Sequence, residues 1–195
     1  LRLLRIVVER YAISLGVTDL RSNTSSAIVI DIGGGTTDVA VVKNGDIIGT
    51  KMFAIGGGVF TKRVVKELNL SYEDAEAKKI DYSNGKLDKT ESAKLNTAFT
   101  QDVKVWLTGV ELCLEEMEEV EEYPTTIYLC GGGALLPEIQ EGLITHPWLQ
   151  LFNFKKYPKV NFIFPTNLRD ISDKTKSATM PADVAPLALA RMILE

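Results

Sequence analysis

The sequence predicts an α/β fold in which a three-stranded antiparallel meander is followed by alternating helices and strands. The meander is predicted from three runs rich in β-branched residues, at 27–32, 36–43 and 46–53, separated by very short turns. Beyond them, stretches of helical periodicity alternate with short apolar runs. The chain has 195 residues, 45% of them hydrophobic and 25% charged, which is enough apolar material for a globular core.

The turns of the meander fix its expected register. Between the first two strands, the segment Asp-Ile-Gly-Gly-Gly-Thr-Thr-Asp at 31–38 places Gly34 and Gly35 in a two-residue hairpin loop, where glycine can take a positive φ. This loop sets Asp31 opposite Asp38. Between the second and third strands, the dipeptide Asn-Gly at 44–45 is a strong signal for a type I′ turn.

The remaining elements follow from hydrophobic periodicity. A helix is predicted before the meander, at 3–14, and the segment 82–87 is rich in turn residues. The elements expected after the meander are helices at about 58–69, 71–80 and 90–122, a strand at 126–130, a helix at 135–145, a strand at 160–164 and a helix at 182–194.

The long helix predicted at 90–122 carries one apolar stripe. Its members recur at steps of three and four residues and are expected to face the core: Val103, Trp106, Val110, Cys113, Met117 and Val120. Glutamates crowd the other faces between 111 and 122, where they oppose the helix macrodipole. We interpret them as a solvated face, with a partner-binding patch as the alternative.

Composition and charge exclude several functions. A net charge of −4 argues against broad nucleic-acid affinity, and a single histidine, His146, argues against a histidine-based metal site. Cys113 and Cys130 are spaced for neither zinc nor a disulfide framework, so reduced thiols are expected. The apolar runs are too short to cross a bilayer and no leader sequence is recognisable. A cytoplasmic chain is therefore expected, with membrane contact only through other parts or partners.

The segment 31–38 combines the groups that bind phosphate and metal. Its glycines let the backbone approach a phosphate, and its threonines offer hydroxyl groups. Asp31 and Asp38 would repel each other on one face of a ladder, unless a divalent cation such as Mg²⁺ lies between them. The alternative is that both are ordinary turn aspartates.

This segment resembles the second phosphate motif of the actin-like ATPase superfamily, which includes actin, heat-shock chaperones, sugar kinases, FtsA and PilM. The resemblance implies a ribonuclease-H-like domain that binds ATP and Mg²⁺. Asp31, Thr36 and Asp38 would then carry the catalytic chemistry, and the two aspartates would order Mg²⁺ through water molecules. The β- and γ-phosphates would be held by the backbone amides of Gly33, Gly34 and Gly35 and by the Thr36 hydroxyl, with Thr37 as a secondary candidate.

Two further motifs follow in the order of that family. The stretch Leu-Cys-Gly-Gly-Gly-Ala-Leu-Leu-Pro at 129–137 is similar to its adenosine motif, so the adenine would lie against Gly131, Gly132 and Gly133, covered by Leu135. The stretches 55–63, which includes Gly57, and 70–79 look like the FtsA and PilM branch in particular. In that family Glu76 and Lys79, three residues apart on one helix face, would reach the ribose; a solvated ion pair is the alternative.

The resemblance also implies a domain organisation. No second phosphate motif occurs upstream of residue 31, so we expect the chain to be the second half of an ATPase core. Residues 1–22 would be a leading helix and linker from the other half, and residues 23–195 the actin-like second domain. A reduced outer helical insertion is expected around 71–122. The aromatic stretch between 153 and 177 matches no motif.

The sequence is compatible with three main functions. The favoured one is the ATP-binding half of an FtsA- or PilM-like ATPase, a nucleotide-dependent scaffold or switch in bacterial cell division or pilus-type assembly. Its partners would be proteins of such an assembly at the inner face of the cell membrane, with self-association left open. The alternatives are a sugar-kinase-like phosphotransferase and a degenerate scaffold that does not hydrolyse ATP; a ribonuclease-H-type nuclease is more remote.

Overall fold

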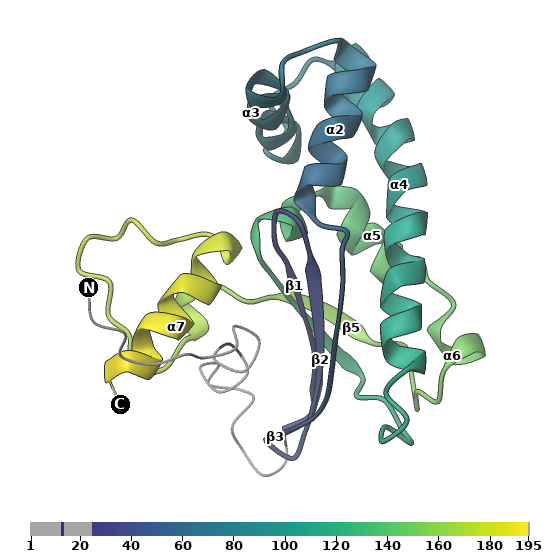
Figure 1. Cartoon of the computed structure of the whole chain (residues 1–195), viewed down its shortest axis with the longest axis vertical. Coiled ribbons are helices and arrows are strands. Elements are labelled where there is room, and N and C mark those ends of the chain that lie inside the picture. The colour runs from purple at the N-terminus through teal and green to yellow at the C-terminus, as the bar shows by residue number, and fades with distance from the viewer. Residues whose placement is uncertain (1–12, 14–24, 195) are drawn as a thin grey trace.

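The computed structural model describes Ile13 and residues 25–194. Apart from Ile13, the predicted helix at 3–14 lies outside these residues, as does most of the predicted segment 1–22. The described residues form a five-stranded sheet in the order β3-β2-β1-β4-β5 (Figure 1). The strands are β1 (Ala27–Ile32), β2 (Thr37–Lys43), β3 (Asp46–Phe53), β4 (Thr126–Cys130) and β5 (Lys159–Phe162).

The predicted meander and its register are confirmed. Strands β1, β2 and β3 pair in antiparallel fashion, and Asp31 lies opposite Asp38. The turn between β2 and β3 has φ values of 55° at Asn44 and 85° at Gly45, as a type I′ turn requires. The expectation of a positive φ at Gly34 or Gly35 is wrong, because the positive-φ glycines of the described chain lie elsewhere.

The helices follow the predicted order with shifted ends. They are α2 (Gly57–Leu68), α3 (Tyr72–Ser83), α4 (Lys89–Glu115), α5 (Pro137–Thr145), α6 (Trp148–Leu151) and α7 (Val184–Leu194). The described residues also contain three short 3₁₀ segments: η2 (Gly132–Leu135), η3 (Pro165–Asn167) and η4 (Pro181–Asp183). The helix α6 and these 3₁₀ segments were not predicted as separate elements.

The predicted extension of the long helix to residue 122 is wrong. Helix α4 ends at Glu115, where carboxylates face the negative end of the helix dipole and disfavour a further turn. Tight turns follow instead, with Met117 N–H donating to Leu114 O and Val120 N–H donating to Met117 O, both at 3.0 Å. The predicted apolar stripe is nevertheless buried along its whole length, because these turns fold Met117 and Val120 back onto the core.

The sheet has a separate hydrophobic core on each face. Side chains alternate along β1, so Ile30 packs into the larger core with α2, α4 and α5, whereas Val29 packs into the smaller core with α7. Figure 1 shows α4 and α7 on opposite sides of the sheet. The same alternation places Asp31 and Asp38 on the α7 side of the sheet.

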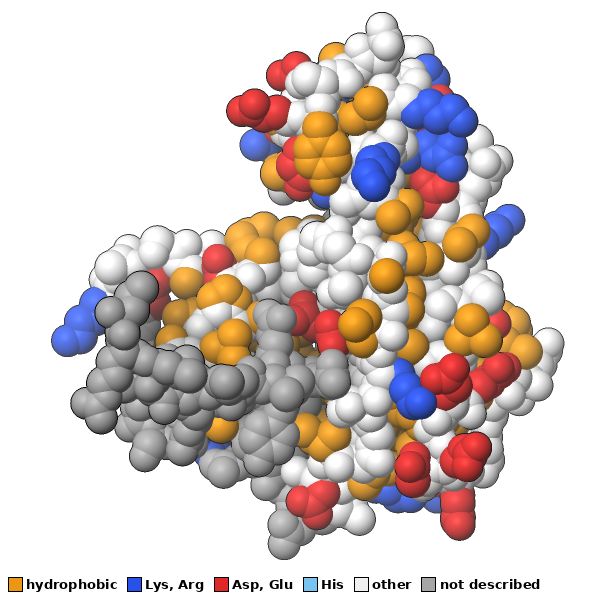
Figure 2. Space-filling view, in the orientation of Figure 1, with side chains coloured by type: hydrophobic (Ala, Val, Ile, Leu, Met, Phe, Trp, Pro, Cys, Tyr) orange, Lys and Arg blue, Asp and Glu red, His pale blue; other side chains and the backbone are white. Residues whose placement is uncertain are grey.

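Helices α2 and α3 and the first part of α4 extend past the end of the sheet and form the projection at the top of the molecule (Figures 1 and 2). Ser71 caps α3, and its hydroxyl accepts a hydrogen bond from the Asp74 N–H at 3.1 Å. None of the helices in the described part of the chain combines the length and the apolar character needed to cross a bilayer.

Candidate functional site

Two glycine-rich loops meet at one edge of the sheet. Strands β1 and β4 are parallel neighbours, so the loops that follow them leave the sheet at the same edge. A pocket of about 260 Å³ opens there, between these loops, α2, α3 and η4. Eight of the residues predicted from the sequence line it: Gly33, Gly34, Gly57, Glu76, Lys79, Gly132, Gly133 and Leu135.

The three glycines after β4 have different structural roles. Gly131 has a φ of 85°, and a Cβ atom added there would lie 2.4 Å from Asp31 Oδ1. A Cβ atom at Gly133 would lie 2.4 Å from Ile32 Cγ2. At Gly132, by contrast, the nearest atom would be Ala182 Cβ at 3.9 Å. Gly131 and Gly133 therefore allow the loop to pack on β1, whereas Gly132 borders open space in the pocket.

The hairpin loop after β1 is held by the first turn of α2. The amides of Gly57 and Gly58 donate to Gly33 O at 2.8 Å and to Gly34 O at 2.7 Å. The Gly33 amide donates to Thr36 O at 2.9 Å, so it is already used inside the loop. Cβ atoms built at Gly34 and Gly35 would meet nothing within 4 Å, so a ligand can approach the backbone at these two positions.

Glu76 and Lys79 form a partly buried ion pair on the face of α3 that lines the pocket. Lys79 Nζ donates to Glu76 Oε2 at 2.7 Å, to Thr61 Oγ1 at 2.9 Å and to Gly57 O at 3.2 Å. An ammonium group has three protons, so this lysine is fully engaged within the protein. Its contribution to a ligand site is therefore to position Glu76 and to attach α3 to α2.

Glu76 is the more accessible partner, with 41% of its side chain exposed against 8% for Lys79. Burial raises the pKa of the Glu76 carboxyl group, but hydrogen bonds from Lys79 and Thr61 outweigh it and hold this pKa below its ordinary value. Within the described residues, the side-chain hydrogen bonds of Glu76 to Thr61 and Lys79 both involve Oε2. Its Oε1 atom therefore remains as an acceptor for a hydroxyl group in the pocket.

The hydroxyl groups and carboxylates of segment 31–38 lie beside the pocket and do not line it. Thr37 is buried in the core, where its hydroxyl donates to Ile55 O at 2.7 Å and accepts from Trp106 Nε1 at 2.9 Å. Asp31 is 7% exposed, and Asp38 faces it across the ladder. Within the described residues, no three His, Cys, Asp or Glu side chains gather as a metal site. Two facing carboxylates fit Mg²⁺ only where water and phosphate complete its coordination.

Several residues that line the pocket were missed by the sequence analysis: Ile80, Ser83, Asn84, Leu136, Met180 and Ala182. A signal existed for two of them, because Ile80 and Ser83 lie four and seven residues after Glu76, on the same helix face. No local signal marks Met180 and Ala182. Segment η4 reaches the pocket because the Gly131 amide donates to Pro181 O at 3.1 Å.

The family model for "Cell division protein FtsA" matches residues 28–149, which is more than half of the chain. The chain belongs to the FtsA family. Among FtsA relatives, the protein of Neisseria meningitidis serogroup B is 47% identical over 60 residues, covering 31% of this chain and 14% of the relative. FtsA of Enterococcus hirae is 33% identical over 133 residues, covering 57% of this chain and 29% of the relative.

Solved structures similar to this FtsA-family chain share its fold, that of the actin-like ATPases. A chain of the PilM-PilN type IV pilus biogenesis complex has a TM-score of 0.57 at 19% identity, covering 96% of this chain and 51% of that one. MreB 5 of Spiroplasma citri bound to AMPPNP has a TM-score of 0.60 at 19% identity, covering 99% and 61%. The chain spans between 14% and 34% of the length of five FtsA relatives, the Neisseria meningitidis and Enterococcus hirae proteins among them.

Proposed function

We propose that this FtsA-family chain is the ATP-binding half of an actin-like ATPase and acts as a nucleotide-dependent scaffold or switch in bacterial cell division. The observation that carries the proposal is the convergence of four separate segments on one pocket. These are the loops after β1 and β4, the start of α2 and one face of α3. Support also comes from the fold shared with an MreB bound to AMPPNP and from relatives named for cell division.

The pocket fits a nucleotide in its donors and acceptors. The adenine would lie against the open backbone at Gly132, beside Leu135, and a ribose hydroxyl would donate to Glu76 Oε1. The phosphates would accept hydrogen bonds from the amides of Gly34 and Gly35. The hydroxyl of Thr36 would supply a further donor.

The facing carboxylates Asp31 and Asp38 would carry the catalytic roles. Asp31 and Asp38 would hold the waters of a Mg²⁺ ion and orient the attacking water, and no covalent step on the protein is needed. Mg-ATP would supply the phosphoanhydride bond that is hydrolysed. Its charge would also close the cleft between this half of the ATPase core and the other half. We expect turnover only together with the other half of the cleft, since actin-like sites lie between two domains.

The wider organisation belongs to the same proposal. Residues 23–195 would form the second domain of the core, and residues around 71–122 a small outer helical subdomain. The partners would be proteins of the division machinery at the cytoplasmic face of the membrane, and self-association is left open. These assignments rest on the family match and on the small share of each relative that the chain covers.

Filling the part of the pocket that is proposed for adenine tests the binding proposal. In Gly132→Val the new Cβ atom meets only Ala182, so the fold is retained while the isopropyl group fills the pocket. We expect calorimetric titration with Mg-ATP to show binding to the wild type and at least about tenfold weaker binding to the variant. Ala93→Val, at an exposed position of α4 outside the pocket, is the control. Equal binding to all three proteins, or binding to none, would contradict the proposal.

Removing one carboxylate separates binding from turnover. Asp38→Ala removes one of the two carboxylates proposed to hold Mg²⁺ and leaves the part of the pocket proposed for adenine intact. In the complete gene product, we expect ATP hydrolysis to be lost while most adenine nucleotide affinity remains. Hydrolysis at the wild-type rate in Asp38→Ala would show that the carboxylates are not the catalytic pair, even if the Gly132→Val result supports binding.

A further inference from the structure

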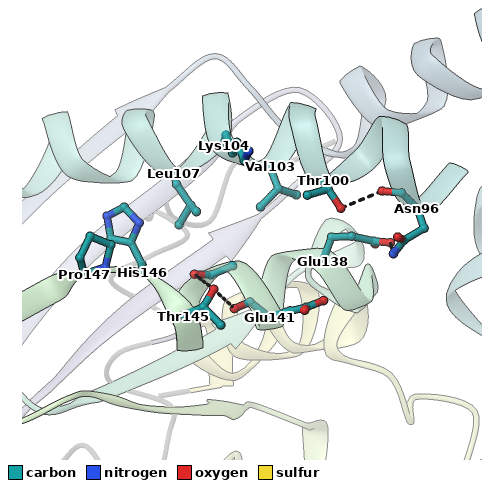
Figure 3. Close-up of a pocket in the computed structure, with 11 residues that line it drawn as sticks. Asn96, Thr100, Val103, Lys104, Leu107, Glu138, Glu141, Thr145, His146 and Pro147 are labelled. Carbon is teal, nitrogen blue, oxygen red and sulfur yellow. Dashed lines mark hydrogen bonds between the residues drawn. The ribbon is translucent and has the colours of Figure 1, made fainter.

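A second pocket lies between α4 and α5, separate from the pocket proposed for the nucleotide. Its volume is about 320 Å³, and it shares no lining residue with the first pocket. Figure 3 shows it as a groove with Asn96 and Glu138 toward one end and His146 and Pro147 at the other. A volume of this size accommodates a small organic solute.

The groove contains a buried carboxylate without a cationic partner. Glu138 is 3% exposed, and its Oε1 atom accepts hydrogen bonds from the Tyr82 hydroxyl and from Asn96 Nδ2, the latter at 2.9 Å. Its Oε2 atom is buried and has no hydrogen-bond partner among the described residues. No Lys, Arg or His in the described part of the chain lies within 4.0 Å of this carboxylate.

This arrangement is costly unless a donor completes it. A buried carboxylate with an unpaired oxygen lacks the solvation that water would give, and buried charges in proteins are normally paired. Glu138 lies in the first turn of α5, where the helix dipole favours a negative charge, but the dipole supplies no donor to Oε2. An ammonium group would supply both a proton donor and the opposite charge.

The walls of the groove define the rest of the ligand. Val103 and Leu107 of α4 are buried beside it and offer apolar surface to an aliphatic chain. Glu141 adds a second carboxylate on the α5 side, whereas Lys104 lines the α4 side. Glu138 and Glu141 therefore favour a ligand with one cationic group near α5. The positive charge of Lys104 disfavours a second cationic group near α4.

We propose that the groove between α4 and α5 binds a small aliphatic monoamine, whose ammonium group donates to Glu138 and whose hydrocarbon part packs on Val103 and Leu107. This site is independent of the nucleotide pocket, so the proposal does not rest on ATP binding. The ligand class is defined by one ammonium group on a short apolar body.

The single histidine of the chain offers a direct readout, because His146 lines the groove. We would follow its ring-proton NMR signals while titrating the full chain with three five-carbon probes: pentylamine, cadaverine and pentanoate. Pentylamine should cause a saturable shift and pentanoate none, and cadaverine should bind more weakly than pentylamine because of Lys104. Equal responses to pentylamine and pentanoate, or no saturable response to either amine, would overturn the proposal.

Variants tie the response to the carboxylate. Glu138→Gln keeps the shape and an acceptor for Tyr82 but removes the charge, so pentylamine should bind about tenfold more weakly. Glu118→Gln makes the same change at an exposed position outside the groove and should leave binding unchanged. If Glu138→Gln does not fold, Thr100→Phe serves in its place, since it fills the exposed rim and should abolish binding. Unchanged binding in a folded Glu138→Gln or Thr100→Phe variant would refute the assignment.

Discussion

Adjacent lysines on α3 have contrasting environments. Lys79 is buried against α2 and pairs with Glu76, whereas Lys78 keeps 32% of its side chain exposed and pairs with Glu91 at 2.6 Å. Water screens the outer pair, so it contributes little to stability. The inner lysine is different, because its removal leaves Gly57 O, Thr61 and Glu76 with fewer partners in a mostly buried position.

We expect Lys79→Met to lower the free energy of unfolding by about 1–3 kcal/mol, since buried acceptors lose their donor. Lys78→Met is the matched control and should cost clearly less, because water screens the exposed ion pair that it removes. Urea denaturation of the two variants beside the wild type measures both values. Equal losses in the two variants would mean that the inner ion pair is no more important than a surface pair.

At the scale of elements, Thr37 joins the β1–β2 hairpin to α4. Its hydroxyl lies between Ile55 O and Trp106 Nε1, in the buried region between sheet and helix. Thr37→Val keeps the shape but leaves a buried carbonyl and a buried indole N–H unpaired. We expect it to reduce the free energy of unfolding by roughly 1–3 kcal/mol.

Thr108→Val on the exposed side of α4 is the control for Thr37→Val. The Thr108 hydroxyl bonds only to Lys104 O of its own helix, at 3.2 Å, so its loss should be nearly neutral. Both variants are compared with the wild type by thermal and chemical denaturation. A neutral Thr37→Val would show that the hairpin and α4 are held together by packing alone.

Elements defined by local chemistry could be predicted from the sequence. The β-branched runs and the Asn-Gly turn gave the meander and its register, and glycine motifs gave much of the pocket lining. The end of α4 could not be placed, because Met117 and Val120 continue the apolar spacing although turns bury them. Met180 and Ala182 could not be found, since only tertiary contacts bring η4 to the pocket.

At the scale of the whole molecule, β1 connects the two cores. Successive residues of this strand pack on opposite faces, so neither core can lose its order without affecting the other. Ile139 is fully buried in the larger core and Ile163 in the smaller one. Both tryptophans, Trp106 and Trp148, belong to the larger core.

We expect Ile139→Val and Ile163→Val each to cost about 0.5–1.5 kcal/mol and to shift one common unfolding transition. The decisive comparison is Ile163→Val followed by tryptophan fluorescence and by far-UV circular dichroism. Coincident midpoints are expected although both tryptophans lie on the other face. Separate midpoints would show that the cores unfold independently.

The parallel pairing of β1 with β4 has a consequence for the order of folding. Ile28 pairs with Ile127, so this contact closes a loop of about a hundred residues, whereas the β1–β2 hairpin closes locally. The hairpin can therefore form early, while the edge shared by both glycine loops is completed late. During synthesis, a nascent chain that ends before residue 126 would carry the loop after β1 but not the loop after β4.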